Sequence, residues 1–84
     1  MQKFNKQEIF WHSRRGMLEL DLLLVPFAQE QFEHLSYENQ SLYNQLLLQE
    51  DQDLWLWLLG QSRPTDPDLA SIIDLILAYN KSKH

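Results

Sequence analysis

The sequence predicts an all-α fold, a compact single-domain bundle of about five short helices within residues 1–84. Two observations predict it. Apolar residues recur every three or four positions along most of the chain, which is the spacing of amphipathic helices. Capping residues, prolines and both glycines fall between these apolar runs, where helices begin and end. A chain of 84 residues can bury one modest core but not two.

The first two helices are expected on either side of Gly16. The first runs from about Lys6 to Arg15, with Asn5 as its N-cap, and Gly16 ends it. The second runs to about His34. Pro26 lies inside it and removes a backbone donor, so we expect a kink or a break in the turn before this proline. The apolar stripe of the second helix consists of Leu20, Leu23, Leu24 and Phe27.

Three further helices follow, each with its own boundary signals. Ser36 caps a third helix that ends near Gln49. Asp51 caps a short fourth helix, and Gly60 ends it in the left-handed conformation. The last helix opens at Asp66–Asp68, with a capping acid and a proline at the first helical position. The residues at helical spacing are Leu42, Tyr43, Leu46 and Leu47 in the third helix and Leu69, Ile72, Ile73 and Ile76 in the last.

The sequence leaves the environment of the tryptophans open. Trp55 and Trp57 lie about 200° apart on the fourth helix, since each residue advances a helix by roughly 100°. Either one packs inside while the other is partly exposed as an anchor for a partner, or the short helix is buried nearly all round. Trp11 lies beside two arginines and is interpreted as a core residue in preference to a shield over them.

The acidic composition argues against nucleic-acid binding. The chain carries 12 acids and 7 bases, a net charge of −5. Residues 1–15 hold four bases and one acid, whereas residues 16–62 hold eight acids and no Lys or Arg. Binding to nucleic acid relies on clustered Lys and Arg against phosphates. The chain offers no such basic surface.

We expect a soluble, cytoplasmic protein. The chain has no cysteine, which is typical of a reducing compartment and excludes disulfides and thiolate nucleophiles. The longest apolar run, Leu22 to Ala28, contains a proline and falls far short of the roughly 20 residues of a membrane span. No signal segment is expected at the N-terminus.

No constellation for catalysis or metal binding is evident in the sequence. The three histidines lie far apart, and none has a second His or a carboxylate at a spacing that recommends a metal site; the i,i+4 pair of Glu8 and His12 is interpreted as an exposed pair on a helix surface. There is no Gly-x-Ser-x-Gly elbow, and two glycines cannot form a phosphate-binding loop. We therefore expect no enzymatic activity, no metal site and no stably bound cofactor.

The segment Trp11–Asp21 holds the densest group of unusual residues, with two arginines, a glycine and two acids. An ion pair of Arg15 with Glu19 or Asp21 would pin the first helix to the second. Exposed ion pairs contribute only about 0 to 1 kcal/mol to stability, which is a weak reason for such a combination. The alternative is a surface that binds another protein, and the residues alone leave both interpretations open.

A family resemblance rests on this same segment. Arg15-Gly16-Met17-Leu18-Glu19 fits the signature Arg-Gly-x-x-Glu. The signature lies within a longer pattern that also contains Ile9, Trp11, Arg14, Leu20, Asp21, Pro26, Phe27, Asp53, Leu54, Trp57, Leu58 and Pro64. In these residues, which extend over nearly the whole chain, the sequence resembles the SdhE family, also called YgfY or CptB. These are small flavin-assembly factors of succinate dehydrogenase and fumarate reductase.

The resemblance implies a five-helix assembly factor without catalytic activity of its own, which we expect to be a monomer. It would bind the flavoprotein subunit of succinate dehydrogenase or fumarate reductase near its FAD and favour covalent attachment of the flavin to a histidine of that subunit. The implied contact residues are Arg15, Gly16 and Glu19, with Arg14, Asp21, Trp11 and His12 as participating neighbours.

Two other functions remain as alternatives. Some bacterial members of the family are described as antitoxin-like regulatory partners of a small membrane toxin protein. An unspecialised helical adaptor is the third interpretation.

Overall fold

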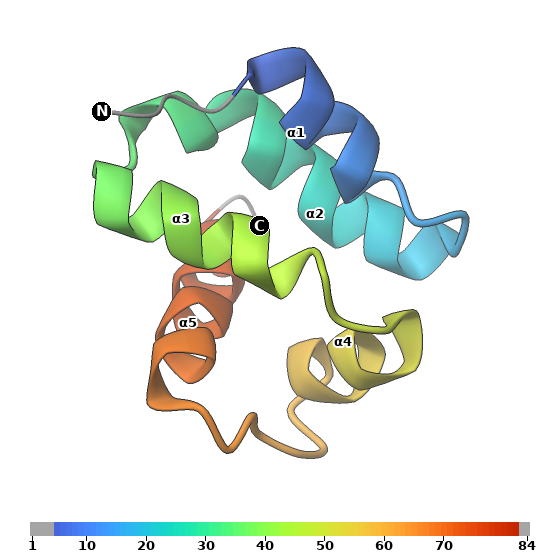
Figure 1. Cartoon of the computed structure of the whole chain (residues 1–84). Helices are drawn as coiled ribbons and strands as arrows, with labels where there is room; N and C mark the ends of the chain where they lie inside the picture. The colour runs from blue at the N-terminus through green and yellow to red at the C-terminus, as the bar shows by residue number, and fades with distance from the viewer. Residues whose placement is uncertain (1–4, 83–84) are drawn as a thin grey trace.

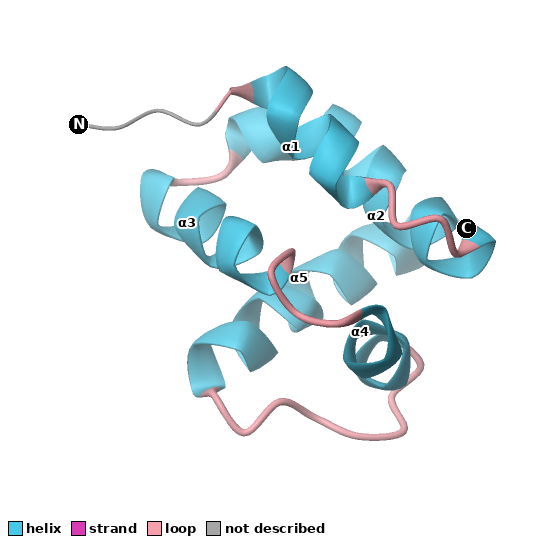
Figure 2. Cartoon of the chain, turned by 45° about the vertical axis from the view of Figure 1, so that its right-hand side comes forward, coloured by secondary structure: helices cyan, strands magenta, loops and turns pink. Residues whose placement is uncertain are grey.

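The computed structural model describes residues 5–82, which form five α-helices and one short 3-10 helix (Figures 1 and 2). No strand occurs among these described residues. The predicted all-α fold is confirmed. The elements are α1 Lys6–Ser13, α2 Leu18–Glu30, η1 Phe32–His34, α3 Tyr37–Leu46, α4 Asp51–Leu58 and α5 Pro67–Ser82.

Helix α2 is the central element of the bundle. It contacts α1, η1, α4 and α5, whereas α3 packs mainly on α5 (Figure 1). After a tight connection the chain returns as α2 alongside α1, so the two form a helical hairpin at one side of the molecule (Figure 1). The Cα radius of gyration is 11.8 Å, close to the roughly 12 Å of a compact domain of this length.

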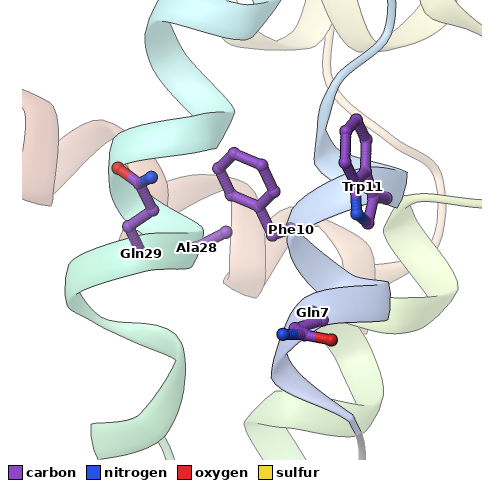
Figure 3. Close-up of a pocket in the computed structure, with 5 residues that line it drawn as sticks. All are labelled: Gln7, Phe10, Trp11, Ala28 and Gln29. Carbon is purple, nitrogen blue, oxygen red and sulfur yellow. The ribbon is translucent and has the colours of Figure 1, made fainter.

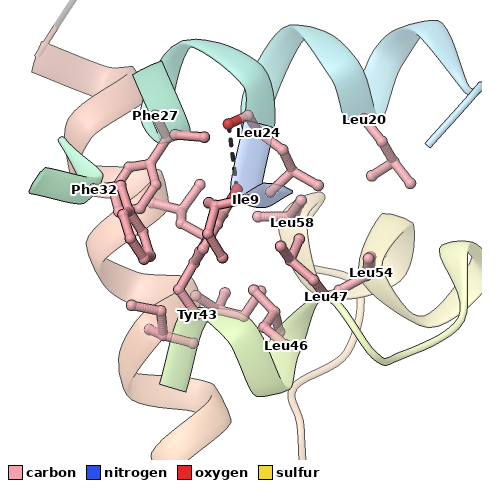
Figure 4. Close-up of a cluster of buried hydrophobic side chains, with 14 of the residues drawn as sticks. Ile9, Leu20, Leu24, Phe27, Phe32, Tyr43, Leu46, Leu47, Leu54 and Leu58 are labelled. Atoms are coloured by element: carbon pink, nitrogen blue, oxygen red, sulfur yellow. Dashed lines mark hydrogen bonds between the residues drawn. The ribbon is translucent and has the colours of Figure 1, made fainter. Parts of the chain in front are cut away.

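One hydrophobic cluster joins every helix (Figure 4). Its largest fully buried side chains include Tyr43, Phe27 and Leu20. The apolar stripes predicted for the second and last helices supply much of this cluster, because burial of one face is what holds a short amphipathic helix in a small protein. The buried members are Ile9, Leu20, Leu24, Phe27, Ala28, Phe32, Tyr43, Leu46, Leu47, Leu54, Leu58, Leu69, Ile72, Ile73 and Ile76.

Several predicted boundaries need correction. Helix α1 ends at Ser13 instead of Arg15, because the backbone is already extended at Arg14 (φ −86°, ψ 111°). The second helix ends at Glu30, and the 3-10 turn Phe32–His34 replaces its predicted last turn. Helix α3 ends at Leu46, three residues before the predicted Gln49. Asp51 is the first residue of α4, and Glu50 takes the N-cap position that we predicted for Asp51.

The predicted caps of the other helices are confirmed. The Oδ1 atom of Asn5 accepts the backbone N–H groups of two residues in the first turn of α1. Ser36 Oγ accepts the N–H of Asn39, and Asp66 Oδ1 accepts that of Asp68. Gly60 has a φ of +77°, the left-handed value expected after α4.

Two sequence-level alternatives are decided by the structure. Helix α2 continues through Pro26 without a break. The proline has no N–H to donate to the carbonyl of Leu22, four residues earlier, and Leu22 is an exposed residue. Trp55 and Trp57 are both half-buried and both pack against the core, so neither the one-in, one-out arrangement nor full burial of α4 holds.

A pair of buried hydroxyl groups links three helices inside the core. Ser13 Oγ donates to the carbonyl of Ile9 at 2.7 Å and lies 2.7 Å from the hydroxyl of Tyr43. With the serine proton directed to Ile9, the single tyrosine proton is shared between Ser13 Oγ and the carbonyl of Leu24. The same hydroxyl lies 3.4 Å from the carbonyl of Leu24 on α2 (Figure 4). Burial raises the pKa of Tyr43 far above its ordinary value, so the phenol stays a neutral donor.

We expect Tyr43→Phe to lower the free energy of unfolding by about 1 kcal/mol, the net value of one lost hydrogen bond. The ring still fills the core, so the fold remains. Urea unfolding followed by circular dichroism measures the change. Ser13→Ala, alone and combined with Tyr43→Phe, provides a double-mutant cycle, and strictly additive losses would contradict direct coupling of the two hydroxyls.

Candidate functional site

The corner between α1 and α2 is built from the four residues 14–17, and it presents the predicted motif. Arg14 is extended as the C-cap of α1, Gly16 has a φ of +84°, and Met17 is the extended N-cap of α2. Only glycine adopts such a positive φ at little cost, so the residue type and the turn agree. Apart from its chain neighbours, no heavy atom of the described residues lies within 4 Å of the point where a Cβ on Gly16 would stand.

Arg15 is held by its own chain. Its side chain is 16% exposed, and its Nε atom lies 2.7 Å from Oδ1 of Asp51 at the start of α4. One terminal nitrogen donates to the carbonyl of Leu47 at 2.6 Å, and the other donates to that of Gln49 at 2.7 Å. A weaker bond of 3.2 Å reaches the carbonyl of His12. The guanidinium therefore fastens the corner to the turn between α3 and α4.

The ion pair of Arg15 involves neither of the two acids that the sequence offered as partners. Within residues 5–82 the guanidinium pairs with Asp51 and with neither Glu19 nor Asp21. Asp21 has a different role, since its Oδ1 accepts the backbone N–H of Arg15 at 2.6 Å. A half-buried carboxylate in the first turn of α2 thus satisfies a backbone donor that the turn would otherwise leave unpaired.

Glu19 and Gly16 face outward from this corner. Glu19 is exposed in the first turn of α2, where the helix dipole favours an acid. Among the cations whose side chains the structure describes, none forms an ion pair with Glu19. Leu18 beside it is also exposed. The side chains of Glu19 and Leu18 are therefore open to contact from another molecule.

Trp11, His12 and Arg14 are exposed as well. Trp11 is 63% exposed, so its interpretation as a core residue is wrong. The Cζ atom of Arg14 lies 5.7 Å from the centre of the Trp11 ring, within the range of a cation–π contact. None of the acids among residues 5–82 pairs with Arg14. The two neighbouring arginines thus have opposite environments, with Arg15 turned inward and Arg14 outward.

A surface hollow of about 420 Å³ lies between this corner and the end of α3. We call it the arginine hollow, and its lining consists of Trp11, His12, Arg14, Arg15, Asn44, Leu47 and Leu48. Sequence analysis missed the contributions of Leu48 and Asn44, and also the role of Asp51. One signal pointed to Leu48, because three leucines in succession, 46–48, cannot all lie on the buried face of one helix.

A second hollow, of about 560 Å³, lies between α1 and α2, and Trp11 lines it as well (Figure 3). The ring of Phe10 projects between α1 and α2 toward Ala28, and the polar side chains of the lining are Gln7 and Gln29 (Figure 3). It contains no titratable lining residue, so it offers no acid or base for chemistry. Among the described residues, no group of three or more His, Asp or Glu is arranged to hold a metal ion.

Comparison with known proteins shows which family this chain is similar to. Residues 7–80 match the sequence profile of a family described as "Flavinator of succinate dehydrogenase". The FAD assembly factor SdhE of Pseudomonas aeruginosa is 48% identical over 71 residues, which cover 84% of each chain. The FAD assembly factor SdhE of Vibrio vulnificus is 45% identical over 78 residues, 93% of this chain and 91% of the relative.

The fold is shared with a solved structure. The solution structure of a UPF0350 protein is similar with a TM-score of 0.76 and 39% sequence identity, covering 99% of this chain and 89% of that chain. The family match over residues 7–80 and this shared fold both include the corner, the turn between α3 and α4, and α4 itself.

The contacts of Arg15 predict that substitution of Arg15 lowers the stability of the protein much more than substitution of Arg14 does. We expect Arg15→Lys to lower the free energy of unfolding by about 2 kcal/mol, because an ammonium cannot replace three differently directed donors to Asp51 and two carbonyls. Arg14→Lys, the matched control one residue earlier, should stay within about 0.5 kcal/mol of the wild type because Arg14 is exposed.

Chemical denaturation of both variants measures this difference. Adding Asp51→Asn to Arg15→Lys should cost less than the sum of the single changes, since the two residues share one interaction. Equal stability of the Arg14 and Arg15 variants would contradict the internal role of Arg15.

Proposed function

The chain belongs to the family of flavinators of succinate dehydrogenase, and from this premise we propose that it is a FAD assembly factor for the flavoprotein subunit of that enzyme. It binds the subunit and promotes covalent attachment of FAD. The bond-forming chemistry belongs to the subunit and its flavin, so this chain is a chaperone-like partner that is not an enzyme and holds no cofactor stably. The flavoprotein subunit of fumarate reductase is a second client of the same kind.

The observation that supports this proposal most strongly is the family match over residues 7–80, which contains the entire corner. The relatives named above are described as FAD assembly factors, which favours this function over the antitoxin-like alternative. None of the helices within residues 5–82 is long and apolar enough to cross a membrane. We further propose that the chain acts in the cytoplasm as a monomer.

Some residues of the corner make contacts within the chain, and others face outward and can contact the client. Arg15 and Asp21 hold the turn in shape through bonds within the chain. Glu19 offers an exposed carboxylate to a cation or an N–H group of the client. Gly16 has open space where a side chain would stand, so the client's backbone can approach closely. Trp11, His12 and Arg14 extend this contact surface along α1.

Binding promotes flavin attachment by selecting one arrangement of the client. A partner shifts a conformational equilibrium only by its difference in affinity for the two states. A tenfold preference for the arrangement that holds flavin and histidine together corresponds to about 1.4 kcal/mol. A rigid corner suits this role, because a surface that adapted to every client conformer would bind them equally and shift none.

The two glycines provide a matched test. Both have positive φ values, +84° at Gly16 and +77° at Gly60, and both have open space at the Cβ position. Gly16→Arg and Gly60→Arg should therefore incur a similar backbone strain of about 1 to 2 kcal/mol while the fold persists. Only Gly16→Arg places a new side chain in the client contact, and we expect it to abolish flavinylation.

Covalent flavin fluorescence of the client subunit, reconstituted with FAD and each variant, measures the effect. Circular dichroism confirms that both variants are folded. If Gly16→Arg supported flavinylation as well as Gly60→Arg does, the corner would not be the contact surface.

A further inference from the structure

The arginine hollow combines apolar walls with a cation that no acid of the described chain neutralises. Trp11 and Leu48 form exposed walls, and Leu48 is 79% exposed. Single exposed apolar side chains are common on protein surfaces, but here two of them line one hollow together with an arginine, which is the kind of grouped apolar surface that marks a binding site. The two side chains come from α1 and from the turn after α3, which Arg15 fastens together. Hydrogen bonds of Arg15 therefore join the two segments that line the hollow.

The charges at the hollow point to an acidic occupant. Residues 16–62 contribute eight acids and no Lys or Arg, so the surface of this region is anionic. Arg14 is a cation within this anionic surface: its Cζ atom lies 5.7 Å from the centre of the Trp11 ring, and no acid among the described residues forms an ion pair with it. Arg15 also lines the hollow, but its donors are already directed to Asp51 and the carbonyls of the turn. Arg14 is therefore the residue through which the hollow can bind an anion.

We propose that the arginine hollow receives a segment of the flavoprotein subunit in which a bulky apolar side chain stands next to an Asp or Glu. The inference rests on the proposed function and specifies its partner chemistry. The apolar side chain packs between Trp11 and Leu48, and the carboxylate binds the guanidinium of Arg14. The amide of Asn44, on the same lining, provides a donor and an acceptor for the backbone of the segment.

The combined chemistry favours a protein segment over other occupants. A small carboxylate would leave the apolar walls uncovered, and a nucleic acid would need many more cations than this surface supplies. A volume of about 420 Å³ is enough for a few side chains. The rival occupant is a second copy of this chain, because exposed Leu18 next to Glu19 has the same apolar and acidic chemistry.

The test compares hollow variants with matched variants elsewhere on the surface. The probe is the flavoprotein subunit of succinate dehydrogenase loaded with FAD that is not yet covalently attached. Its dissociation constant is measured for Arg14→Gln and Leu48→Ala. The controls are Arg63→Gln, whose guanidinium pairs with exposed Asp74, and Leu59→Ala, another exposed leucine.

We expect Arg14→Gln to weaken binding about tenfold or more, the usual effect of losing a charge-assisted hydrogen bond. Leu48→Ala should weaken it about tenfold through lost apolar burial. Arg14→Lys should retain most of the affinity, and both controls should bind as the wild type does. The salt dependence of the dissociation constant should also become shallower in Arg14→Gln, because an ionic contact is gone.

The outcomes separate this inference from the proposed function. If the wild-type chain fails to bind the subunit, the proposed function is wrong and this inference with it. If the wild type binds and promotes flavinylation while Arg14→Gln and Leu48→Ala bind equally well, only the hollow is excluded. A concentration-dependent dimer of the free chain that Leu48→Ala abolishes would instead assign the hollow to a second copy and overturn the proposal.

An exchange of charges between the two proteins tests directly whether Arg14 binds a carboxylate of the subunit. Arg14→Glu should prevent binding, and one Asp→Arg or Glu→Arg change in the subunit should restore it. That subunit variant should bind the wild-type chain poorly. A scan of the subunit's surface acids in which no change rescues Arg14→Glu would contradict a carboxylate partner.

Discussion

The arrangement of this small bundle depends on the guanidinium of Arg15. The carbonyls of Leu47 and Gln49 lie just beyond the last turn of α3, where helix geometry leaves carbonyl groups without partners and with partial negative charge. Asp51 stands in the first turn of α4, where an acid is favoured. One planar cation with donors in several directions satisfies all three groups, which a flexible ammonium cannot do. Two turns distant in sequence thereby become one rigid unit.

Because the backbone is extended at Arg14, the side chains of Arg14 and Arg15 point in different directions and have different roles. Successive side chains in extended backbone point to opposite sides, whereas a helix continuing to Arg15 would have placed them on nearby faces. Arg15 consequently turns toward the α3–α4 turn, and Arg14 turns toward solvent and the ring of Trp11. Because α1 ends at Ser13, Arg15 can bind the turn between α3 and α4 while Arg14 remains exposed.

The exposed groups of the corner form a small surface. Stable interfaces bury well over 1,000 Å² in total, and smaller contacts are typical of transient complexes. The exposed groups at the corner are few, and they combine charge with apolar area in a small space. A preorganised surface loses less entropy on docking than a flexible one, so a small contact of this kind can still bind a partner.

The sequence by itself determined the helical class, most caps and the location of the motif. These features follow from local periodicity, capping chemistry and glycine conformation, which involve residues within a few positions of each other. The partner of Arg15 and the exposure of Trp11 and Leu48 were decided by the tertiary structure. Asp51 lies 36 positions from Arg15, and nearer acids offered equally plausible pairs. Only the packing of α3 and α4 against the corner decides which carboxylate, and which leucine, comes within reach.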